Sequence, residues 1–358
     1  MKNLEFPIIS TKVEGLTKKF DLSQADQRKE YFLAKAGSEI EKIREYMKDH
    51  TFIANMVGKK NAGKGTYSKI FGEIFGMDKI AHVSVGDCVR DIHANWAEFE
   101  KSEEFKDLKK HYRGFISFDE AVERLHGRSQ SGLLPTEFIL ALLKYNIAKH
   151  EGKTLFIDGL PREMDQISYS LYFRDLINYR EDPDMFILLD VAESIIEERI
   201  KYRVICPICK TPRNTKCLTT KNVGYDKEKE EFYLICDNSE CSGCGSERMV
   251  PKEGDSLGIE PIRDRLAKDE EIMKMIFNIH GVPKILLRNN IPSAVANDNF
   301  DDYEITPGYS YEWDEANQKV ITHESKWTIK DDNGIDSYSL LPHPVVIGML
   351  KQMAEILG

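Results

Sequence analysis

Long apolar runs are missing from this sequence of 358 residues. None approaches the roughly 20 consecutive apolar residues that a helix needs to cross a bilayer. The opening stretch, MKNLEFPIISTKVEG, also lacks the apolar core of a signal peptide. A basic surface is missing too: the formal net charge is -10, which argues against a protein whose whole surface binds nucleic acid. We therefore expect a cytoplasmic protein that associates with neither membranes nor nucleic acid.

Cysteine is scarce outside one segment of the chain. Six of the 7 cysteines lie between residues 206 and 244, and the other is Cys88. Close pairs such as Cys206 and Cys209 are more typical of a metal site than of disulfides, which suits a reducing compartment. The alternative is a cluster of reduced cysteines that holds no metal.

Short apolar runs alternate with helical patterns through most of the chain. Apolar residues make up 41% of the sequence, enough for a sizeable core. The alternation predicts a parallel sheet with helices on both faces, and ligands bind beyond the carboxyl ends of such strands. The predicted buried strands are five runs, at residues 52–58, 79–85, 154–160, 185–191 and 283–288.

Two segments interrupt this alternation. Residues 204–256 are rich in cysteine, lysine and glycine, and they predict a small β-rich insert. Residues 292–340 carry turns, aromatic residues and strand-like alternation, from which we expect a β-hairpin at the end of the sheet. Ahead of the first strand, residues 23–48 predict a helix that begins with a capping box between Ser23 and Asp26.

The first predicted strand leads into a phosphate-binding loop. Gly58 is followed after four residues by Gly63 and Lys64, which is the spacing of a P-loop. Backbone N–H groups of such a loop surround an anion, and the positive end of the next helix and the lysine both face the phosphates. The Ser or Thr expected directly after the lysine is missing, because Gly65 stands there and Thr66 follows.

The run AGKGT at residues 62–66 resembles the nucleoside monophosphate kinases, and the adenylate kinases most closely. In that family a glycine follows the lysine and a threonine comes next. The middle of the loop departs from the family, since Lys59, Lys60 and Asn61 replace the usual alanine, proline and glycine. Asparagine tolerates a left-handed backbone better than most residues. The ATP-binding residues that the resemblance implies here are Gly58, Asn61, Gly63, Lys64, Gly65 and Thr66.

A second stretch, HVSVGDCVRDI at residues 82–92, is similar to the family's acceptor-binding segment. Gly86, Asp87 and Arg90 match the family pattern, whereas Val85 replaces the usual threonine. The resemblance implies that Val85, Gly86 and Arg90 contact the acceptor nucleotide, with Arg90 also among the catalytic cations.

A third stretch, SGLLPTEFILALL at residues 131–143, resembles another part of the acceptor site. Leu134 fits the family pattern and is expected to contact the acceptor, but Thr136 stands where the family has aspartate. Because Val85 and Thr136 both depart from the pattern, a kinase for another nucleoside monophosphate remains an alternative.

The stretch FIDGLPREMDQ at residues 156–166 is close to a family signature. Asp158 ends a predicted strand, where a carboxylate can hold Mg²⁺ through water. Arg162 can bind the acceptor phosphate through two hydrogen bonds from its planar guanidinium group. Gln166 can offer both a donor and an acceptor to an adenine edge, and Gly159 is expected to line the acceptor site.

The resemblance extends to both ends of the family's mobile lid. In EERIKYRVICP, residues 197–207, Arg199 matches an arginine that stacks on the donor adenine and Arg203 one that contacts phosphates. In EPIRDRL, Arg265 is preferred over Arg263 as a further phosphate ligand. The strand that closes the lid offers two candidates for one more cation, Arg248 and Lys252.

The cysteine-rich insert lies where some family members carry a zinc-binding lid. Four thiolates make a closed structural zinc site, which replaces a core that so small an insert cannot build. Cys244 competes with Cys241 as the fourth ligand, and Cys217 is expected to be spare. The predicted zinc ligands are Cys206, Cys209, Cys236 and Cys241.

These features together predict a P-loop three-layer α/β/α fold with a five-stranded parallel sheet. The expected divisions are a helical extension (1–50), a core (51–203) with the acceptor-binding segment 85–140, a zinc lid (204–256), the continued core (257–291), a β-rich insert (292–340) and a C-terminal core helix (341–358). The expected reaction is ATP and AMP to two ADP, by a monomer active in nucleotide biosynthesis.

No general base is needed for this reaction, because the attacking phosphate is already an anion. Catalysis would come from positioning and from positive charge at the transferred group, with Mg²⁺ bound to ATP. The alternative from another class is a zinc-ribbon nucleic-acid-binding protein with a regulatory P-loop. The expected catalytic cations are Lys64, Arg90, Arg162, Arg203 and Arg265.

Overall fold

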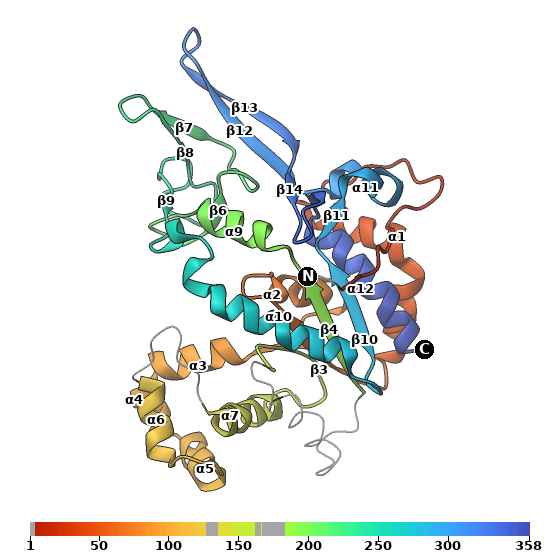
Figure 1. Ribbon diagram of the computed structural model, residues 1–358, viewed down its shortest axis with the longest axis vertical. Coiled ribbons are helices and arrows are strands. Elements are labelled where there is room, and N and C mark those ends of the chain that lie inside the picture. Colours follow the sequence, from red (N-terminus) through yellow and green to blue (C-terminus); the bar gives the residue numbers. More distant parts are fainter. Residues whose placement is uncertain (1–3, 127–134, 162–165, 167–182) are drawn as a thin grey trace.

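The computed structural model describes residues 4–126, 135–161, 166 and 183–358. Its centre is a parallel sheet of five strands in the order β10-β4-β1-β3-β2 (Figure 1). The five strands are β1 (Ile53–Gly58), β2 (Ile80–Ser84), β3 (Thr154–Asp158), β4 (Asp184–Asp190) and β10 (Lys284–Arg288). Each predicted strand is present and parallel to its neighbours, which confirms the predicted fold class.

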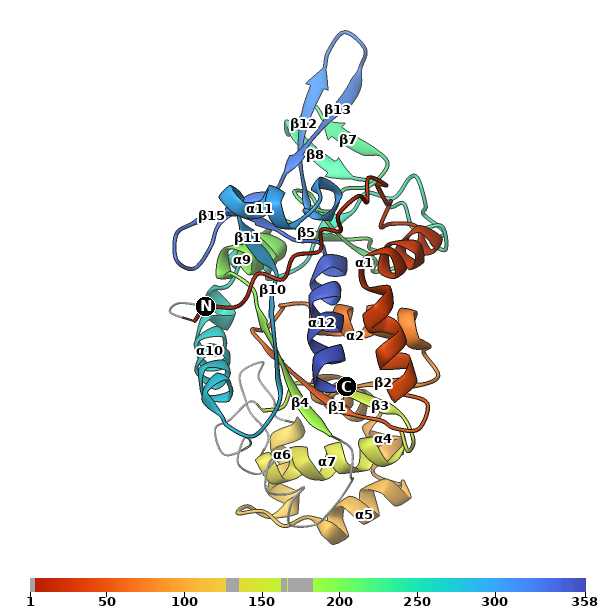
Figure 2. The same cartoon turned by 90° about the vertical axis from the view of Figure 1, so that its right-hand side faces the viewer.

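Side chains alternate between the two faces of this sheet, as the two-residue period of a strand requires. Ala54 and Met56 of β1 pack in one apolar cluster with three helices, whereas Val57 packs in another with α10. Figure 2 shows the three helices on one side of the sheet and α10 on the other. The four helices are α1 (Ala25–Tyr46), α2 (Lys64–Phe75), α12 (Pro342–Ile356) and α10 (Arg263–Asn278).

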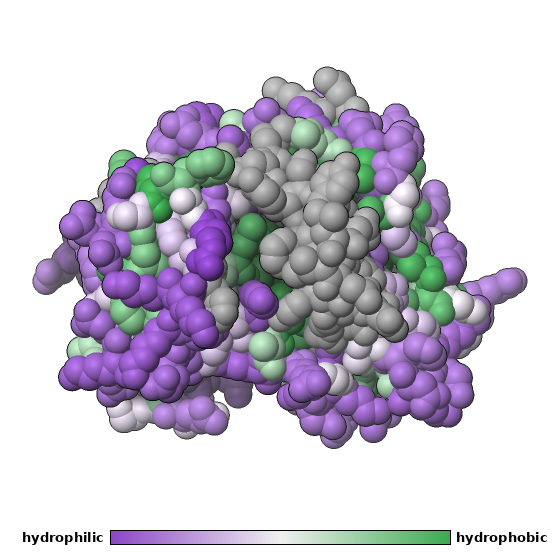
Figure 3. All heavy atoms as spheres, turned by 90° about the horizontal axis from the view of Figure 1, so that it is seen from below, coloured by the Kyte–Doolittle hydropathy of each residue, from purple (hydrophilic) through white to green (hydrophobic). Residues whose placement is uncertain are grey.

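A third apolar cluster lies between β2, β3 and the helices of the acceptor-binding segment. Aromatic side chains such as Phe118 and Phe138 fill it, with Tyr112 packed against both. Seen from below, most of the coloured surface at this end of the molecule is hydrophilic, with smaller apolar patches between the polar side chains (Figure 3). The helices here are α3 (Val85–Ala94), α4 (Trp96–Phe99), α5 (Glu103–His111), α6 (Phe118–His126) and α7 (Thr136–Ala148).

The cysteine-rich segment follows α9 (Glu193–Lys201) and forms two small antiparallel sheets. One sheet has the order β6-β5-β9, and the other is the hairpin β7-β8. The elements of this lid segment are β5 (Arg203–Ile205), β6 (Pro212–Asn214), β7 (Val223–Asp226), β8 (Glu231–Leu234), β9 (Val250–Pro251) and the 3₁₀ turns η1 (Asp255–Leu257) and η2 (Glu260–Ile262).

The segment 292–340 contains the expected hairpin, but the hairpin packs against the lid rather than at the end of the central sheet (Figure 1). Tyr225 of β7 stacks on Trp313 of β12, with ring centroids 4.9 Å apart. A short helix that the sequence pattern did not predict precedes the hairpin. The elements are β11 (Asn290–Pro292), α11 (Ser293–Asn299), η3 (Asp302–Glu304), β12 (Pro307–Asp314), β13 (Lys319–Lys326), β14 (Thr328–Lys330) and β15 (Asp336–Ser339).

The N-terminal extension is joined to that segment by a buried polar network. Glu304 is fully buried and accepts hydrogen bonds from Tyr31 (2.5 Å) and Thr11 (2.7 Å). The predicted capping box of α1 is wrong, because Ser23 donates to Asp21 instead of capping the helix. No helix in the described part of the chain has the length and apolarity that a bilayer crossing demands.

Candidate functional site

The P-loop joins the end of β1 to the start of α2. Asn61 (φ 66°) and Gly63 (φ 90°) both adopt the left-handed backbone, so asparagine does take the place of a family glycine. Gly58 is required by close packing, because a Cβ there would lie 2.9 Å from the carbonyl oxygen of Leu189 in β4. Gly65 and Thr66 form the first turn of α2 and are exposed, so the positive end of the helix faces open space.

Lys64 lies across this loop. Its Nζ donates to the carbonyl oxygens of Gly58 (3.0 Å) and Lys59 (3.3 Å), and it lies 3.6 Å from Asp158 Oδ1. The sheet creates this proximity, because Asp158 pairs in register with Met56 at the same carboxyl edge. The predicted phosphate lysine and the predicted Mg²⁺ carboxylate are thus neighbours.

Arg265 reaches the same place from α10. One pocket is lined by Gly58, Lys64, Gly159 and Arg265, together with Asp269. Asp269 accepts from Arg265 Nε (2.7 Å) and also from the backbone N–H of Lys60 (2.8 Å). No sequence motif pointed to Asp269, although its position four residues after Arg265 on a helix places both on one face.

The two lid arginines make contacts at the base of the lid. Arg203 donates two hydrogen bonds to Asp255, at 2.6 and 2.8 Å, and this pair joins the first lid strand to the turn that ends the lid. Arg199 donates to Asn289 Oδ1 (3.1 Å), and Asn289 in turn donates to Tyr67 of α2 (3.1 Å). Neither arginine has a described polar contact with the P-loop.

The acceptor segment begins at the end of β2. Ser84 caps α3 by accepting from the N–H of Asp87 (3.2 Å), and Val85 is buried in the first turn beside Gly86. The side chain of Arg90 is 71% exposed and pairs with Asp87 one turn away on the same helix. The structure thus places Arg90 on an open face, without a described contact to Lys64.

The predicted base-reading residue is buried. Gln166 Nε2 donates to Thr136 Oγ1 (3.2 Å), so the residue that departs from the family's aspartate touches the one that is expected to read the base. Two other predicted contacts, Leu134 and Arg162, lie outside the described residues.

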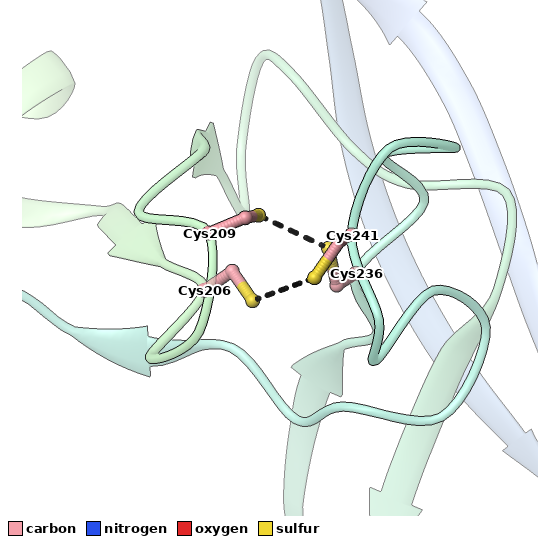
Figure 4. A group of neighbouring side chains, drawn as sticks. All are labelled: Cys206, Cys209, Cys236 and Cys241. Atoms are coloured by element: carbon pink, nitrogen blue, oxygen red, sulfur yellow. Dashed lines mark hydrogen bonds between the residues drawn. The ribbon is translucent and has the colours of Figure 1, made fainter.

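The lid brings four cysteines together (Figure 4). The Sγ atoms of Cys206 and Cys241 lie 3.8 Å apart, as do those of Cys209 and Cys236. All four sulfurs lie within 4.8 Å of one another. Tetrahedral zinc with Zn–S bonds of about 2.3 Å requires sulfurs about 3.8 Å apart, so the group fits that ion. Cys244 is exposed and outside the group.

The thiols of this group differ in acidity. A hydrogen bond with Thr211 lowers the pKa of Cys209 to about 6, whereas burial raises the pKa of Cys236 to about 12. Thiols must lose their protons to bind a metal. Metal binding at this group would therefore release protons, and it would weaken as the pH falls.

The chain is similar in sequence to known adenylate kinases. No protein-family model matches the chain. It is 32% identical to the adenylate kinase of Thermotoga petrophila over 154 residues, which are 43% of this chain and 59% of that enzyme. It is 28% identical to the adenylate kinase of Thermotoga neapolitana over 233 residues, 65% of this chain and 86% of that enzyme. The adenylate kinase of Clostridium tetani is 26% identical over 212 residues, 59% and 78% of the two chains.

The share of each relative's length that the chain covers varies. The chain spans less than two thirds of the length of several relatives, among them the enzymes of Thermotoga petrophila and Kosmotoga olearia, of which it covers 59% and 66%. The chain is thus similar to adenylate kinases in sequence, and its sheet and P-loop have the arrangement that the resemblance implied.

Proposed function

We propose that this chain is a nucleoside monophosphate kinase that transfers the γ-phosphoryl group of ATP to AMP, giving two ADP. The observation that carries the proposal is the convergence of Lys64, Asp158 and Arg265 at the carboxyl edge of the sheet, around a P-loop with the AGKGT sequence. The similarity to adenylate kinases supports a phosphotransferase.

The reaction follows from charge and position. The acceptor phosphate attacks as an anion, so the chain supplies no base but holds the two nucleotides in line. Lys64 and Arg265, which line one pocket, would stabilise negative charge on the transferred group. Bound Mg²⁺ would neutralise the donor phosphates, and Asp158, 3.6 Å from Lys64 Nζ, would hold it through water.

The lid would carry a structural zinc ion and close over the donor. Cys206, Cys209, Cys236 and Cys241 would fill all four positions of the ion, leaving none for catalysis. A closed lid excludes water that could otherwise take the phosphoryl group. Closure is also the step in which Arg199 and Arg203 would exchange their present partners for the nucleotide.

AMP is proposed as the acceptor because of Gln166. A glutamine amide can pair with N1 and N6 of adenine together, and Thr136 orients that amide in the structure. Val85 cannot supply the hydroxyl of the family's threonine, but one lost neutral hydrogen bond is worth only about 1 kcal/mol.

The test is ADP formation from ATP and AMP in a coupled assay, with purified wild type, Lys64→Ala and Lys69→Ala. Lys69 is an exposed lysine of the same helix and serves as the matched control. Loss of the Lys64 charge should lower kcat by a factor on the order of 100 or more, whereas Lys69→Ala should retain wild-type kcat. Near-normal turnover by Lys64→Ala would remove the P-loop from the mechanism.

A further inference from the structure

The second residue of the P-loop, Lys59, has an unusual environment. Its side chain is only 1% exposed, although lysine is almost never fully buried unless paired. Its Nζ lies 2.8 Å from Asp332, 3.4 Å from Glu193 and 3.7 Å from Glu270. A loop residue of the proposed donor site is therefore held by a group of carboxylates from three other segments.

The nearest of these carboxylates belongs to the segment 292–340. Asp332 lies in the turn between β14 and β15, where Asp331 accepts from the N–H groups of Asn333 and Ile335 (both 2.9 Å). The second oxygen of Asp332 accepts from the N–H of Glu193 (2.8 Å), at the first residue of α9. Asp332 thus joins the P-loop to the helix that leads into the lid.

The pKa values of Lys59 and Asp332 both shift in the direction that favours the charged form. Burial alone would lower the pKa of Lys59, but Asp332 and the neighbouring glutamates raise it above the usual lysine value. Burial alone would raise the pKa of Asp332, but Lys59 lowers it below the usual aspartate value. Both groups are therefore charged at neutral pH, and removing Asp332 leaves the buried ammonium group of Lys59 without the nearest of its three described carboxylates.

The backbone of Lys59 also takes part in the hydrogen bonds within the P-loop. Its carbonyl oxygen accepts from Lys64 Nζ (3.3 Å) and from the N–H of Ala62 (3.1 Å). A shift of Lys59 would therefore move the phosphate lysine and the turn that precedes it.

We propose that Asp332 is a positioning residue for the donor site, which holds the P-loop in its phosphate-binding form through Lys59. The inference rests on the proposed kinase function. It adds that the segment 292–340 helps to hold the ATP-binding loop in place. It concerns ATP rather than the acceptor, because Lys59 belongs to the P-loop itself and Asp332 binds its side chain.

The test compares Asp332→Asn, Lys59→Met and the double variant with wild type. Asparagine keeps an oxygen for the N–H of Glu193, and methionine keeps most of the lysine chain. Each single variant should raise the KM for ATP, and the Kd for a non-hydrolysable ATP analogue, by on the order of tenfold, while the KM for AMP changes less than about twofold. The double variant should bind ATP no more weakly than the weaker single variant, because both changes break one interaction.

Asp336→Asn is the control, since Asp336 makes an exposed ion pair with Lys330 in the same segment and should leave ATP binding unchanged. The inference would be overturned if affinity for ATP and for AMP fell equally in variants with a lower Tm, or if the losses of ATP affinity were additive in the double variant. Either result would leave the proposed function standing. Failure of the wild type to bind the ATP analogue would overturn the proposed function and this inference together.

Discussion

The lid, which we propose closes over the donor, and the acceptor-side helices are held together by different means. The lid has a small apolar cluster in which three of the buried residues are cysteines. Its base depends on the Arg203–Asp255 pair, and its outer hairpin is packed against β12 of the segment 292–340. The lid thus depends on polar groups and on a neighbouring segment.

The acceptor-side helices pack in a continuous apolar cluster that they share with β2 and β3 of the central sheet. Their functional candidate, Arg90, projects from that cluster on an exposed helix face. Apolar burial maintains a fold over a wide range of conditions, whereas a thiolate site depends on a metal and on pH. The comparison indicates that removal of zinc should affect the lid and leave the acceptor side folded.

The largest effect should follow the loss of one cysteine of the cluster. Cys206→Ser is expected to abolish the binding of one zinc per chain, because it leaves only three of the four thiolates. The lid should then loosen, because metal binding at structural zinc sites contributes about 10 kcal/mol or more to folding. Metal analysis measures the first result, and hydrogen exchange should show faster exchange at β5–β9 than in wild type but unchanged exchange in α3–α7.

Cys244→Ser is the matched control, because Cys244 lies in the same segment but outside the sulfur group. It should retain zinc and the wild-type exchange pattern. Retention of zinc by Cys206→Ser, or its loss in Cys244→Ser, would show that the ligand set is wrong.

A smaller effect is expected on the acceptor side, from Gln166→Leu. The variant should lose on the order of tenfold in kcat/KM for AMP, because adenine's polar edge would face an apolar side chain. The comparison of AMP, CMP, UMP and GMP with ATP as donor measures the effect. Equal losses for all four acceptors would mean that Gln166 does not read the base, and a wild-type preference for another base would refute the assignment of AMP.

The smallest effect concerns the contact between the lid and its neighbouring segment. Tyr311 OH donates to the carbonyl oxygen of Thr215 and contacts Thr219 Oγ1, both at 2.8 Å. Tyr311→Phe should reduce the free energy of unfolding by about 1 kcal/mol, measured by denaturant titration. Tyr309→Phe is the control, because Tyr309 binds Lys216 through its backbone N–H, and an equal loss there would argue against a specific hydroxyl contact.

Local patterns predicted much of this molecule. Short apolar runs between helical patterns located all five strands of the sheet, because a strand buried on both faces requires such a run. The sequence prediction also named Cys241 rather than Cys244 as the fourth zinc ligand, and Cys241 is the one in the sulfur group. These features depend on residues close together in the chain.

Long-range contacts were not predictable in this way. Lys59 and Asp332 are 273 positions apart, and neither belongs to a pattern that names the other. The lysine at position 59, which departs from the family's loop pattern, was a signal in the sequence, but it could not identify its partner. The packing of the β12–β13 hairpin on the lid was missed for the same reason, since aromatic residues alone do not say which surface they contact.

The central claim is phosphoryl transfer to a nucleotide, and transfer of a γ-phosphate label tests it most directly. Wild-type protein would be incubated with AMP and ATP labelled in the γ-phosphate, and the products separated. The account predicts label in the β-phosphate of ADP formed from AMP, with little label in inorganic phosphate. Label released only as inorganic phosphate, or retained entirely in ATP, would contradict it and would favour a P-loop that regulates rather than transfers.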